Sequence, residues 1–264
     1  MSAGSDLLVA QGITKRFGGV SALADVSFTI RRGEIYGLIG PNGAGKTSLF
    51  NVLTGIYDAD GGEFTFEGRP LAGLKPNDVA ERGIARTFQN IRLFANLSAL
   101  ENVMIGRHVR TRASVFGAIV RNPRTLAEER AIEERAHELL EYVGVHRRAN
   151  DLAKHLAYGD QRRLEIARAL ATDPRLLALD EPAAGMNATE TAALRSLLEN
   201  IRRDGVTILL IEHDMKLVMS VCDRVLVLDY GRKIAEGPAA EVQKDEKVIA
   251  AYLGGEVTLN LKGA

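Results

Sequence analysis

Eight residues near the start of the chain have the spacing of a loop that wraps a polyphosphate. They read Gly40-Pro41-Asn42-Gly43-Ala44-Gly45-Lys46-Thr47 and match the pattern G-x-x-x-x-G-K-[ST]. Glycines let backbone N–H groups turn inward without a Cβ clash, which makes a nest for anionic oxygens. The Lys46 side chain can reach β- and γ-phosphates, and the Thr47 hydroxyl can ligate Mg²⁺. The segment therefore predicts a nucleotide-binding site.

A second chemical centre is the run Leu176-Leu177-Ala178-Leu179-Asp180-Glu181. Its apolar residues predict a buried strand, and ligands bind at the C-terminal ends of parallel strands. Asp180 suits the shell of a Mg²⁺ ion, directly or through water. Glu181 points differently, so it can polarise a water for in-line attack on a γ-phosphate. A strand that ends in two surface acids is common, so the pair indicates a catalytic site only in combination with the phosphate loop.

Two single residues are candidates to complete this site. His213 follows the strand predicted over residues 206–211 by two positions, where it would donate to a phosphate or a water. Gln89 carries an amide that would touch Mg²⁺ or the attacking water. Spacing alone leaves open whether His213 is a surface histidine in a turn and whether Gln89 belongs to the site.

Strands and helices must hold these residues in place. A buried strand is expected to lead into the phosphate loop, and a helix over residues 47–53 would turn its positive dipole end toward the phosphates. After residue 156 helices and strands alternate, as in a parallel sheet with crossover helices. The predicted strands cover residues 7–11, 26–30, 35–39, 61–68, 175–180, 206–211 and 224–229.

Residues 91–156 differ from both flanks because they read as mainly helical. Thr125 with Glu128 three residues later has the spacing of a capping box, and Gly144 stands where a helix stops. The charged residues of this helix are expected to form a solvated face. Its apolar stripe consists of Ile132, Ala136, Leu139, Leu140 and Val143.

The composition excludes several classes of protein. The chain of 264 residues holds 34 Lys and Arg and 34 Asp and Glu, so it lacks the basic field that broad nucleic-acid binding requires. Cys222 is the only cysteine, so no internal disulfide can form, as in a reducing compartment. No apolar run approaches the roughly 20 residues that span a bilayer, and the first six residues lack the features of a signal peptide. We expect a cytosolic protein that is able to sit against a membrane protein.

With these motifs in this order, residues 7–253 resemble the ATPase subunits of ABC transporters. Gly40–Thr47 is similar to the family's Walker A motif and residues 176–180 to its Walker B motif. Phe17 falls at the aromatic that stacks on adenine, a physical use for an exposed phenylalanine. Gln89 matches the Q-loop glutamine and His213 the switch histidine.

The resemblance implies ATP and Mg²⁺ as the bound groups and assigns roles to single residues. The catalytic residues would be Glu181, His213, Gln89 and Lys46. The nucleotide would be held by Phe17, Gly40, Pro41, Asn42, Gly43, Ala44, Gly45, Lys46, Thr47, Ser48, Tyr158, Gly159 and Asp160. The Mg²⁺ ion would be held by Thr47, Gln89 and Asp180.

The implied fold is α/β, with a P-loop NTPase core around a mixed, largely parallel sheet. An N-terminal antiparallel β subdomain and an α-helical subdomain would complete it. A single ATPase domain is expected over residues 7–254. Its core would take residues 7–90 and 157–254, its helical subdomain residues 91–156, and a tail residues 255–264.

The family signature Leu-Ser-Gly-Gly-Gln is altered here to Leu156-Ala157-Tyr158-Gly159-Asp160. Ala157 lacks the hydroxyl that the family serine gives to the ATP of the opposite subunit. Asp160 suits the first turn of a helix but stands near a phosphate of the same sign. The Gly159 N–H and the helix end remain suited to anions. In the D-loop, residues 184–187, Asn187 stands where the family usually has aspartate.

The finer resemblance is to high-affinity branched-chain amino-acid importers, through residues 93–103, 161–170, 180–187 and 251–254. It implies ATP hydrolysis that powers uptake through two transmembrane permease subunits. The other partners would be a second ATPase subunit, identical or a paralogue, and indirectly a periplasmic or extracellular solute-binding protein. The subunit would lie peripherally on the cytoplasmic side of the inner membrane. Related ATPases for lipopolysaccharide, urea or other amides share much of the pattern, so the cargo stays open.

Three other functions compete with this one. A GTPase switch would want an Asn-Lys-x-Asp motif, and the sequence has none. A soluble ABC ATPase that acts on ribosomes or DNA usually carries tandem cassettes or a long coiled coil, whereas this chain has one cassette. A catalytically weakened regulatory subunit is suggested by Ala157 and Asn187. The presence of Lys46, Asp180, Glu181 and His213 argues against it.

Overall fold

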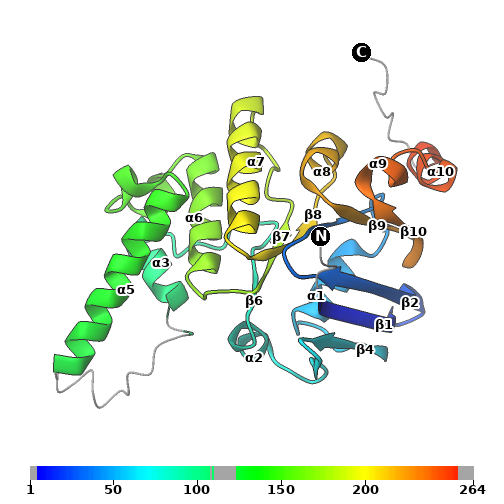
Figure 1. The fold of residues 1–264 in the computed structure, drawn as a ribbon, viewed down its shortest axis with the longest axis horizontal. Coiled ribbons are helices and arrows are strands. Elements are labelled where there is room, and N and C mark those ends of the chain that lie inside the picture. Colours follow the sequence, from blue (N-terminus) through cyan, green and yellow to red (C-terminus); the bar gives the residue numbers. More distant parts are fainter. Residues whose placement is uncertain (1–4, 108, 110–122, 255–264) are drawn as a thin grey trace.

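The computed structural model describes residues 5–107, 109 and 123–254, and within these the strands form two sheets. The smaller sheet has the order β2-β1-β4-β5 and is antiparallel. Its strands are β1 (Asp6–Phe17), β2 (Val20–Arg31), β4 (Gly61–Phe66) and β5 (Arg69–Pro70). Figure 1 shows this sheet in blue and cyan at the lower right, beside the core.

The larger sheet has the order β10-β9-β3-β8-β7-β6 and is parallel except where β10 pairs with β9. Every residue of β3, β7 and β8 is buried, as expected for strands covered on both faces. Its strands are β3 (Ile35–Ile39), β6 (Ile84–Arg86), β7 (Leu176–Asp180), β8 (Thr207–Ile211), β9 (Arg224–Asp229) and β10 (Arg232–Pro238).

Helices connect and cover the larger sheet. In Figure 1, α7 and α8 rise above it, α9 and α10 follow β10, and α1 lies on the side of the smaller sheet. The helices of this part are α1 (Lys46–Leu53), α2 (Pro76–Glu81), α7 (Ala188–Arg203), α8 (Met215–Val221), α9 (Ala239–Val242) and α10 (Glu246–Gly254).

Between β6 and β7 the chain forms a helical segment, which occupies the left end of the molecule in Figure 1. Helix α5 packs against α3 and α6. Ala136, Leu139, Leu140 and Val143 of the predicted apolar stripe are buried, and Ile132 is half-buried. Residues 108, 110–122 and 255–264 of the predicted helical subdomain and tail lie outside the described residues. The elements are α3 (Ala99–Arg107), α5 (Pro123–Tyr142), η2 (His146–Arg148), η3 (Ala153–His155) and α6 (Tyr158–Leu170).

Several predicted element boundaries were wrong, including the start of β2 at Val20 instead of residue 26 and the end of β4 at Phe66 instead of residue 68. Helix α5 begins at Pro123, two residues before the expected cap at Thr125, because proline suits a first turn whose N–H groups have no partner within the helix. Strand β1 continues past Gln11 to Phe17, with its pairing to β2 shifted between Ala10 and Ile13. Gly12 lies in that shift with φ of 63°, so a bulge breaks the alternation without ending the strand.

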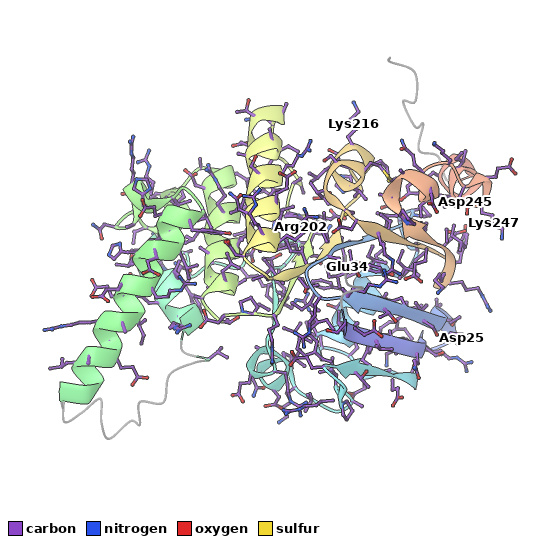
Figure 2. All side chains as sticks on the ribbon, viewed as in Figure 1. Asp25, Glu34, Arg202, Lys216, Asp245 and Lys247 are labelled. Carbon is purple, nitrogen blue, oxygen red and sulfur yellow. The ribbon has the colours of Figure 1, made fainter. Side chains whose placement is uncertain are left out.

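A partly buried ion-pair network joins the two sheets. Glu34 accepts from the Arg31 N–H at 2.7 Å and pairs with Arg224 at 3.3 Å. Arg224 also donates to the Thr29 carbonyl of β2 and to Glu236 of β10, at 3.0 and 2.6 Å. In Figure 2 Glu34 lies inside the molecule, whereas Lys216 projects outward from α8. The network fixes the turn before β3, and hence the strand that leads to the phosphate loop.

Among the described helices, none has both the length and the apolar composition that crossing a membrane requires.

Asn102 of α3 ties the segment after Gln89 to the helical segment. It is fully buried, and its Oδ1 accepts from the Phe94 N–H at 2.9 Å. Its Nδ2 donates to the carbonyls of Phe94 and Ser98 at 3.1 and 2.9 Å. A buried amide with three such bonds holds the loop over residues 94–98 against the helix.

We expect Asn102→Ala to lower the melting temperature by about 5 °C or more, because it removes the acceptor of the Phe94 N–H and two bonds to loop carbonyls. Circular dichroism during heating measures this. Asn200→Ala is the matched control, since the Asn200 side chain is exposed and accepts at 3.0 Å from Arg203, which is itself exposed. Equal melting temperatures for Asn102→Ala and the wild type would contradict the assigned role.

Candidate active site

The predicted phosphate loop connects β3 to α1 through residues whose backbone excludes most side chains. Gly40 has φ of 149°, and a Cβ there would lie 2.1 Å from the Leu228 carbonyl oxygen. Gly45 has φ of 101°, and a Cβ there would lie 2.5 Å from the Ala22 carbonyl oxygen. The pattern's glycines are therefore required by neighbouring backbone as well as by the turn itself.

Lys46 is the first residue of α1 and is only 8% exposed. Its ammonium donates to the carbonyls of Gly40 and Pro41 at 2.7 and 3.0 Å, so it folds back across its own loop. Burial lowers the pKa of Lys46, and the charges of Glu181 and Asp180 oppose that shift. The cation therefore lies within electrostatic reach of both predicted acids.

The rest of the loop offers surface to a ligand. Asn42, Gly43 and Thr47 are exposed, while Ala44 is buried and its carbonyl accepts from the Gly231 N–H at 2.9 Å. Gly45 caps α1 with no side-chain bond, so the first N–H groups of the helix stay available for an anion. Pro41 and Ser48 are half-buried at its edges.

Asp180 and Glu181 end β7 with different surroundings. Asp180 is 5% exposed, and its N–H donates to the Thr87 hydroxyl at 3.3 Å. Burial raises the pKa of Asp180, and the positive charge of Arg86 opposes that shift. Glu181 has φ of 47°, a left-handed conformation that is rare for a residue with a side chain, and its N–H donates to the Ile211 carbonyl. The chain thus turns sharply between the two carboxylates.

Glu181 meets two of the other three predicted catalytic side chains. Gln89 Nε2 donates to Glu181 Oε2 at 3.1 Å. His213 Nδ1 lies 3.5 Å from the same oxygen, and the imidazole is largely exposed. The structure therefore brings Gln89, Glu181 and His213 into one cluster, a proximity that spacing alone left open.

Two residues beside this site were missed by the sequence reasoning: Glu212, which bonds the backbone of His213, and Arg86, whose charge acts on Asp180. Glu212 is fully buried, and its carboxylate accepts from the N–H groups of Ala183 and His213 at 2.8 and 3.2 Å. Arg86 stacks between the rings of Phe50 and Phe88 and donates to the Thr54 hydroxyl at 2.6 Å. Burial lowers the pKa of Arg86 to about 10. The sequence held one signal for both residues: Arg86 is the last residue of β6 and Glu212 directly follows β8, so each is a charged residue at the end of an apolar strand.

The altered signature forms the N-terminus of α6. Ala157 is the N-cap and makes no side-chain bond to the helix. Asp160 pairs with Arg163 at 2.7 Å, so its charge is partly balanced by a residue one turn on. A Cβ on Gly159 would lie 2.6 Å from Glu190 Oε1 of α7. The signature residues therefore pack against the D-loop side of the chain.

The unusual D-loop residue Asn187 has a structural role as the N-cap of α7. Its side chain accepts from the Glu190 N–H at 3.0 Å, and the Glu190 carboxylate accepts from the Asn187 N–H at 2.9 Å. This reciprocal pair is a capping box.

Phe17 lies at the end of β1 and is 44% exposed. Its ring meets the ring of Tyr57 edge-on, with centroids 5.2 Å apart, and Lys15 lies over it. Tyr57, which the sequence reasoning did not single out, adds a second exposed ring to the surface expected to receive adenine.

Among the described residues, no group of three or more His, Cys, Asp or Glu side chains is placed to hold a metal ion. The predicted ligands Thr47, Gln89 and Asp180 carry a hydroxyl, an amide and a carboxylate. Hard oxygen ligands of this kind suit Mg²⁺, which also keeps waters and binds phosphate oxygens. The donor set therefore fits a magnesium ion that arrives with a nucleotide.

The comparisons with known proteins agree with this geometry. The family model "ABC transporter" matches residues 23–184, which hold the phosphate loop, Gln89, the signature and both acids.

The chain belongs to the ABC transporter family.

A second model, "Branched-chain amino acid ATP-binding cassette transporter", matches residues 232–258 of this ABC ATPase. The chain is 45% identical to the high-affinity branched-chain amino acid transport ATP-binding protein LivG of Salmonella typhimurium, over 94% of this chain and 98% of that protein. It is 43% identical to BraF of Pseudomonas aeruginosa, a protein with the same description, over the same shares. It is also 34% identical to the lipopolysaccharide export system ATP-binding protein LptB of Escherichia coli, over 96% of this chain and 99% of that protein.

Solved structures show the same fold. The ADP conformation of MJ1267, an ATP-binding cassette of an ABC transporter, superposes with a TM-score of 0.83 at 32% identity, covering 95% of this chain and 99% of that one. CbiO1 from Clostridium perfringens, part of the complex cbiONQ, superposes with a TM-score of 0.79 at 27% identity, covering 96% of each chain. The fold is thus the α/β P-loop NTPase fold of ABC ATPases, and family membership implies ATP binding and hydrolysis.

We expect Lys46→Ala to weaken ATP binding at least about tenfold, because the buried ammonium is the cation of the phosphate loop. Isothermal titration with ATP measures the affinity. Lys244→Ala, at an exposed lysine after α9, is the control and should bind as the wild type does. Unchanged affinity in Lys46→Ala would refute the proposed role of the loop.

Proposed function

We propose that this ABC ATPase binds MgATP with the phosphate loop of residues 40–48 and hydrolyses it with Glu181 as the base. The observation that carries the proposal is the contact of Gln89 and His213 with one oxygen of Glu181, beside Asp180 at the end of β7. Three polar groups gathered at the ligand edge of a parallel sheet are a site for phosphoryl chemistry.

We assign a role to each of these residues. Glu181 accepts the proton of the attacking water, and the Gln89 amide holds the carboxylate in position through the 3.1 Å bond. His213 donates to the terminal phosphate or the water. Lys46 exchanges its two loop carbonyls for β- and γ-phosphate oxygens and balances the charge that develops there. Phe17 and Tyr57 offer ring surface to adenine.

The Mg²⁺ ion would be held by Asp180, Thr47 and Gln89 and would supply charge neutralisation between the β- and γ-phosphates. Burial raises the pKa of Asp180 and so favours its neutral form. A nearby cation would act in the opposite direction and favour the ionised carboxylate. Asp180 therefore serves binding of the metal, while Glu181 serves the water.

Two such subunits, identical or paralogous, would close head to tail around two ATP molecules. The N-terminus of α6, with exposed Tyr158, buried Gly159 and half-buried Asp160, would cover the nucleotide on the partner's phosphate loop. Support comes from the dimeric structure of a post-hydrolysis state of the cassette MJ0796 bound to ADP and Pi, which superposes with a TM-score of 0.75 at 25% identity, covering 88% of this chain and 99% of that one. The γ-phosphate would favour closure, and hydrolysis would reverse it.

The cargo would be branched-chain amino acids, taken up through two transmembrane permease subunits and delivered by an external solute-binding protein. The 43–45% identity to LivG and BraF and the model matched at residues 232–258 support this cargo. Lipopolysaccharide transport is the second candidate, because LptB is 34% identical over nearly the whole chain. The subunit would then sit on the cytoplasmic face of the inner membrane.

The permease subunits would dock on a groove of about 350 Å³ where the helical segment meets the core. Its apolar wall includes Phe88, Phe94 and Ile105, and Arg86 and Arg168 stand at its side. Phe88 directly precedes Gln89, so a force on this groove reaches the glutamine that bonds Glu181. Because the groove lies where the helical segment meets the core, we assign residues 7–90 and 157–254 to the ATPase core and residues 91–156 to a helical subdomain.

Glu181→Gln is expected to bind ATP with wild-type affinity and to lose at least about 99% of turnover, because an amide cannot accept the proton. The variant should also accumulate closed dimers with ATP. Phosphate release and size-exclusion chromatography with MgATP measure both outcomes. Glu199→Gln, at a partly exposed glutamate of α7, is the control. Full turnover in Glu181→Gln would refute the assigned base.

The cargo can be tested on the intact complex. Purification through a tag on this chain is expected to yield two membrane subunits, and proteoliposomes that hold the complex should accumulate leucine, isoleucine or valine with ATP and a binding protein. Glu181→Gln in the same complex is the inactive control. Lipopolysaccharide extraction without amino-acid uptake would select the second candidate.

A further inference from the structure

Arg162, in the second turn of α6, is a guanidinium buried between the signature and the Q-loop. The residue is 3% exposed. Nη1 donates to the Phe88 carbonyl at 2.8 Å, and Nη2 donates to the Gln89 carbonyl. Nε and Nη2 both donate to the Tyr158 hydroxyl, at 3.2 and 2.9 Å. The planar fork thus joins two backbone carbonyls to one phenol oxygen.

The charge of Arg162 is balanced locally. Nη1 lies 3.5 Å from Glu165 Oε2, and the Glu165 side chain is 1% exposed. Arg168 lies 3.8 Å from the other carboxylate oxygen. Because a buried charge without partners is costly, this arrangement keeps the guanidinium in one place. A lysine would keep the charge and lose the fork, since an ammonium cannot reach three acceptors in a plane.

On one side the fork ends at the catalytic cluster. The Gln89 carbonyl is an Arg162 acceptor, and the Gln89 amide donates to Glu181 at 3.1 Å. The position of Arg162 therefore sets the backbone from which the Gln89 side chain reaches Glu181. His213 Nδ1 lies 3.5 Å from the same carboxylate oxygen of Glu181.

On the other side the fork ends at the surface of the signature. Tyr158 is 44% exposed, and its ring packs on the D-loop, where a Cβ on Gly185 would lie 3.1 Å from a ring carbon. In the closed dimer proposed above, this surface faces the nucleotide of the partner subunit. A displacement of the Tyr158 hydroxyl changes the acceptors available to Nε and Nη2 of Arg162.

We propose that Arg162 is a positioning residue that couples the signature at Tyr158 to the Gln89–Glu181 pair of the same subunit, so that occupation of one ATP site adjusts the base of the other. The inference rests on the proposed function, because it needs ATP at the partner's loop and Glu181 as base. The pathway is contiguous, from Tyr158 through Arg162 and Gln89 to Glu181, and each step is a direct hydrogen bond.

The test uses Tyr158→Phe, Arg162→Lys and the double variant in the intact purified transporter, with steady-state hydrolysis of MgATP as the readout. Tyr158→Phe removes one oxygen and keeps the ring against Gly185. We expect kcat to fall about fivefold in Tyr158→Phe and about tenfold in Arg162→Lys, with KM for ATP within about twofold of wild type. In the double variant Tyr158→Phe should add less than about twofold, because its effect passes through the lost fork.

Several outcomes would overturn the inference. An unchanged kcat in Tyr158→Phe removes the coupling, and a full fivefold effect of Tyr158→Phe in the Arg162→Lys background means that the hydroxyl acts directly on the nucleotide. A loss that appears in KM or in melting temperature instead of kcat means that Arg162 is merely structural. Arg195→Lys, at an exposed arginine of α7, is the matched control and should keep wild-type kcat. Absence of hydrolysis in the wild-type complex would instead refute the proposed function.

Discussion

The whole site depends on the pairing of three buried strands, β3, β8 and β7, in one parallel sheet. The register places Leu38 and Asp180 opposite the same residue of β8, Ile211. The phosphate loop, the acid pair and the segment that carries His213 must therefore leave the sheet at neighbouring points on one edge. Because hydrogen bonds of the sheet fix this edge, backbone pairing sets where the phosphate loop, Asp180 and the segment of His213 leave the sheet.

Much of this arrangement could be predicted from the residues themselves. The continuous apolar runs of β3, β7 and β8 identify them as buried strands, and Gly40 to Thr47 has a spacing that few other structures require. The stripe of α5 was also correct, because a 3.6-residue period survives tertiary packing. What local pattern could not supply was contact between distant segments. Arg162 meets Gln89 from 73 residues away, and Glu212 caps the turn at Ala183 from 29 residues away. The bulge at Gly12 was missed because a glycine in a strand pattern is compatible both with the end of the strand and with a bulge inside it. The start of α5 at Pro123 was missed because Thr125 and Pro123 both suit the start of a helix.

The departures from the family pattern have structural partners in this chain. The acid at position 160 is paired with Arg163, and the amide at position 187 caps α7 through a reciprocal bond with Glu190. A Cβ on Gly159 would lie 2.6 Å from Glu190 Oε1, so the signature turn lies beside the residue that completes the capping box of α7. Ala157 alone has no such compensation among the described contacts, and the backbone N–H groups at the start of α6 remain as the anion-binding groups of that turn.

The left-handed backbone of Glu181 has a consequence for how this protein can be stabilised. Glycine or asparagine adopts φ of 47° more readily than glutamate, so local folding preference and proton transfer ask for different residues at one position. The strain is held by the Glu181 N–H bond to Ile211 and by the sheet beneath it. Selection for thermal stability alone would therefore favour replacement of Glu181, and with it the loss of the proposed base. A thermostable variant that stays active must keep glutamate at this position despite its unfavourable φ angle.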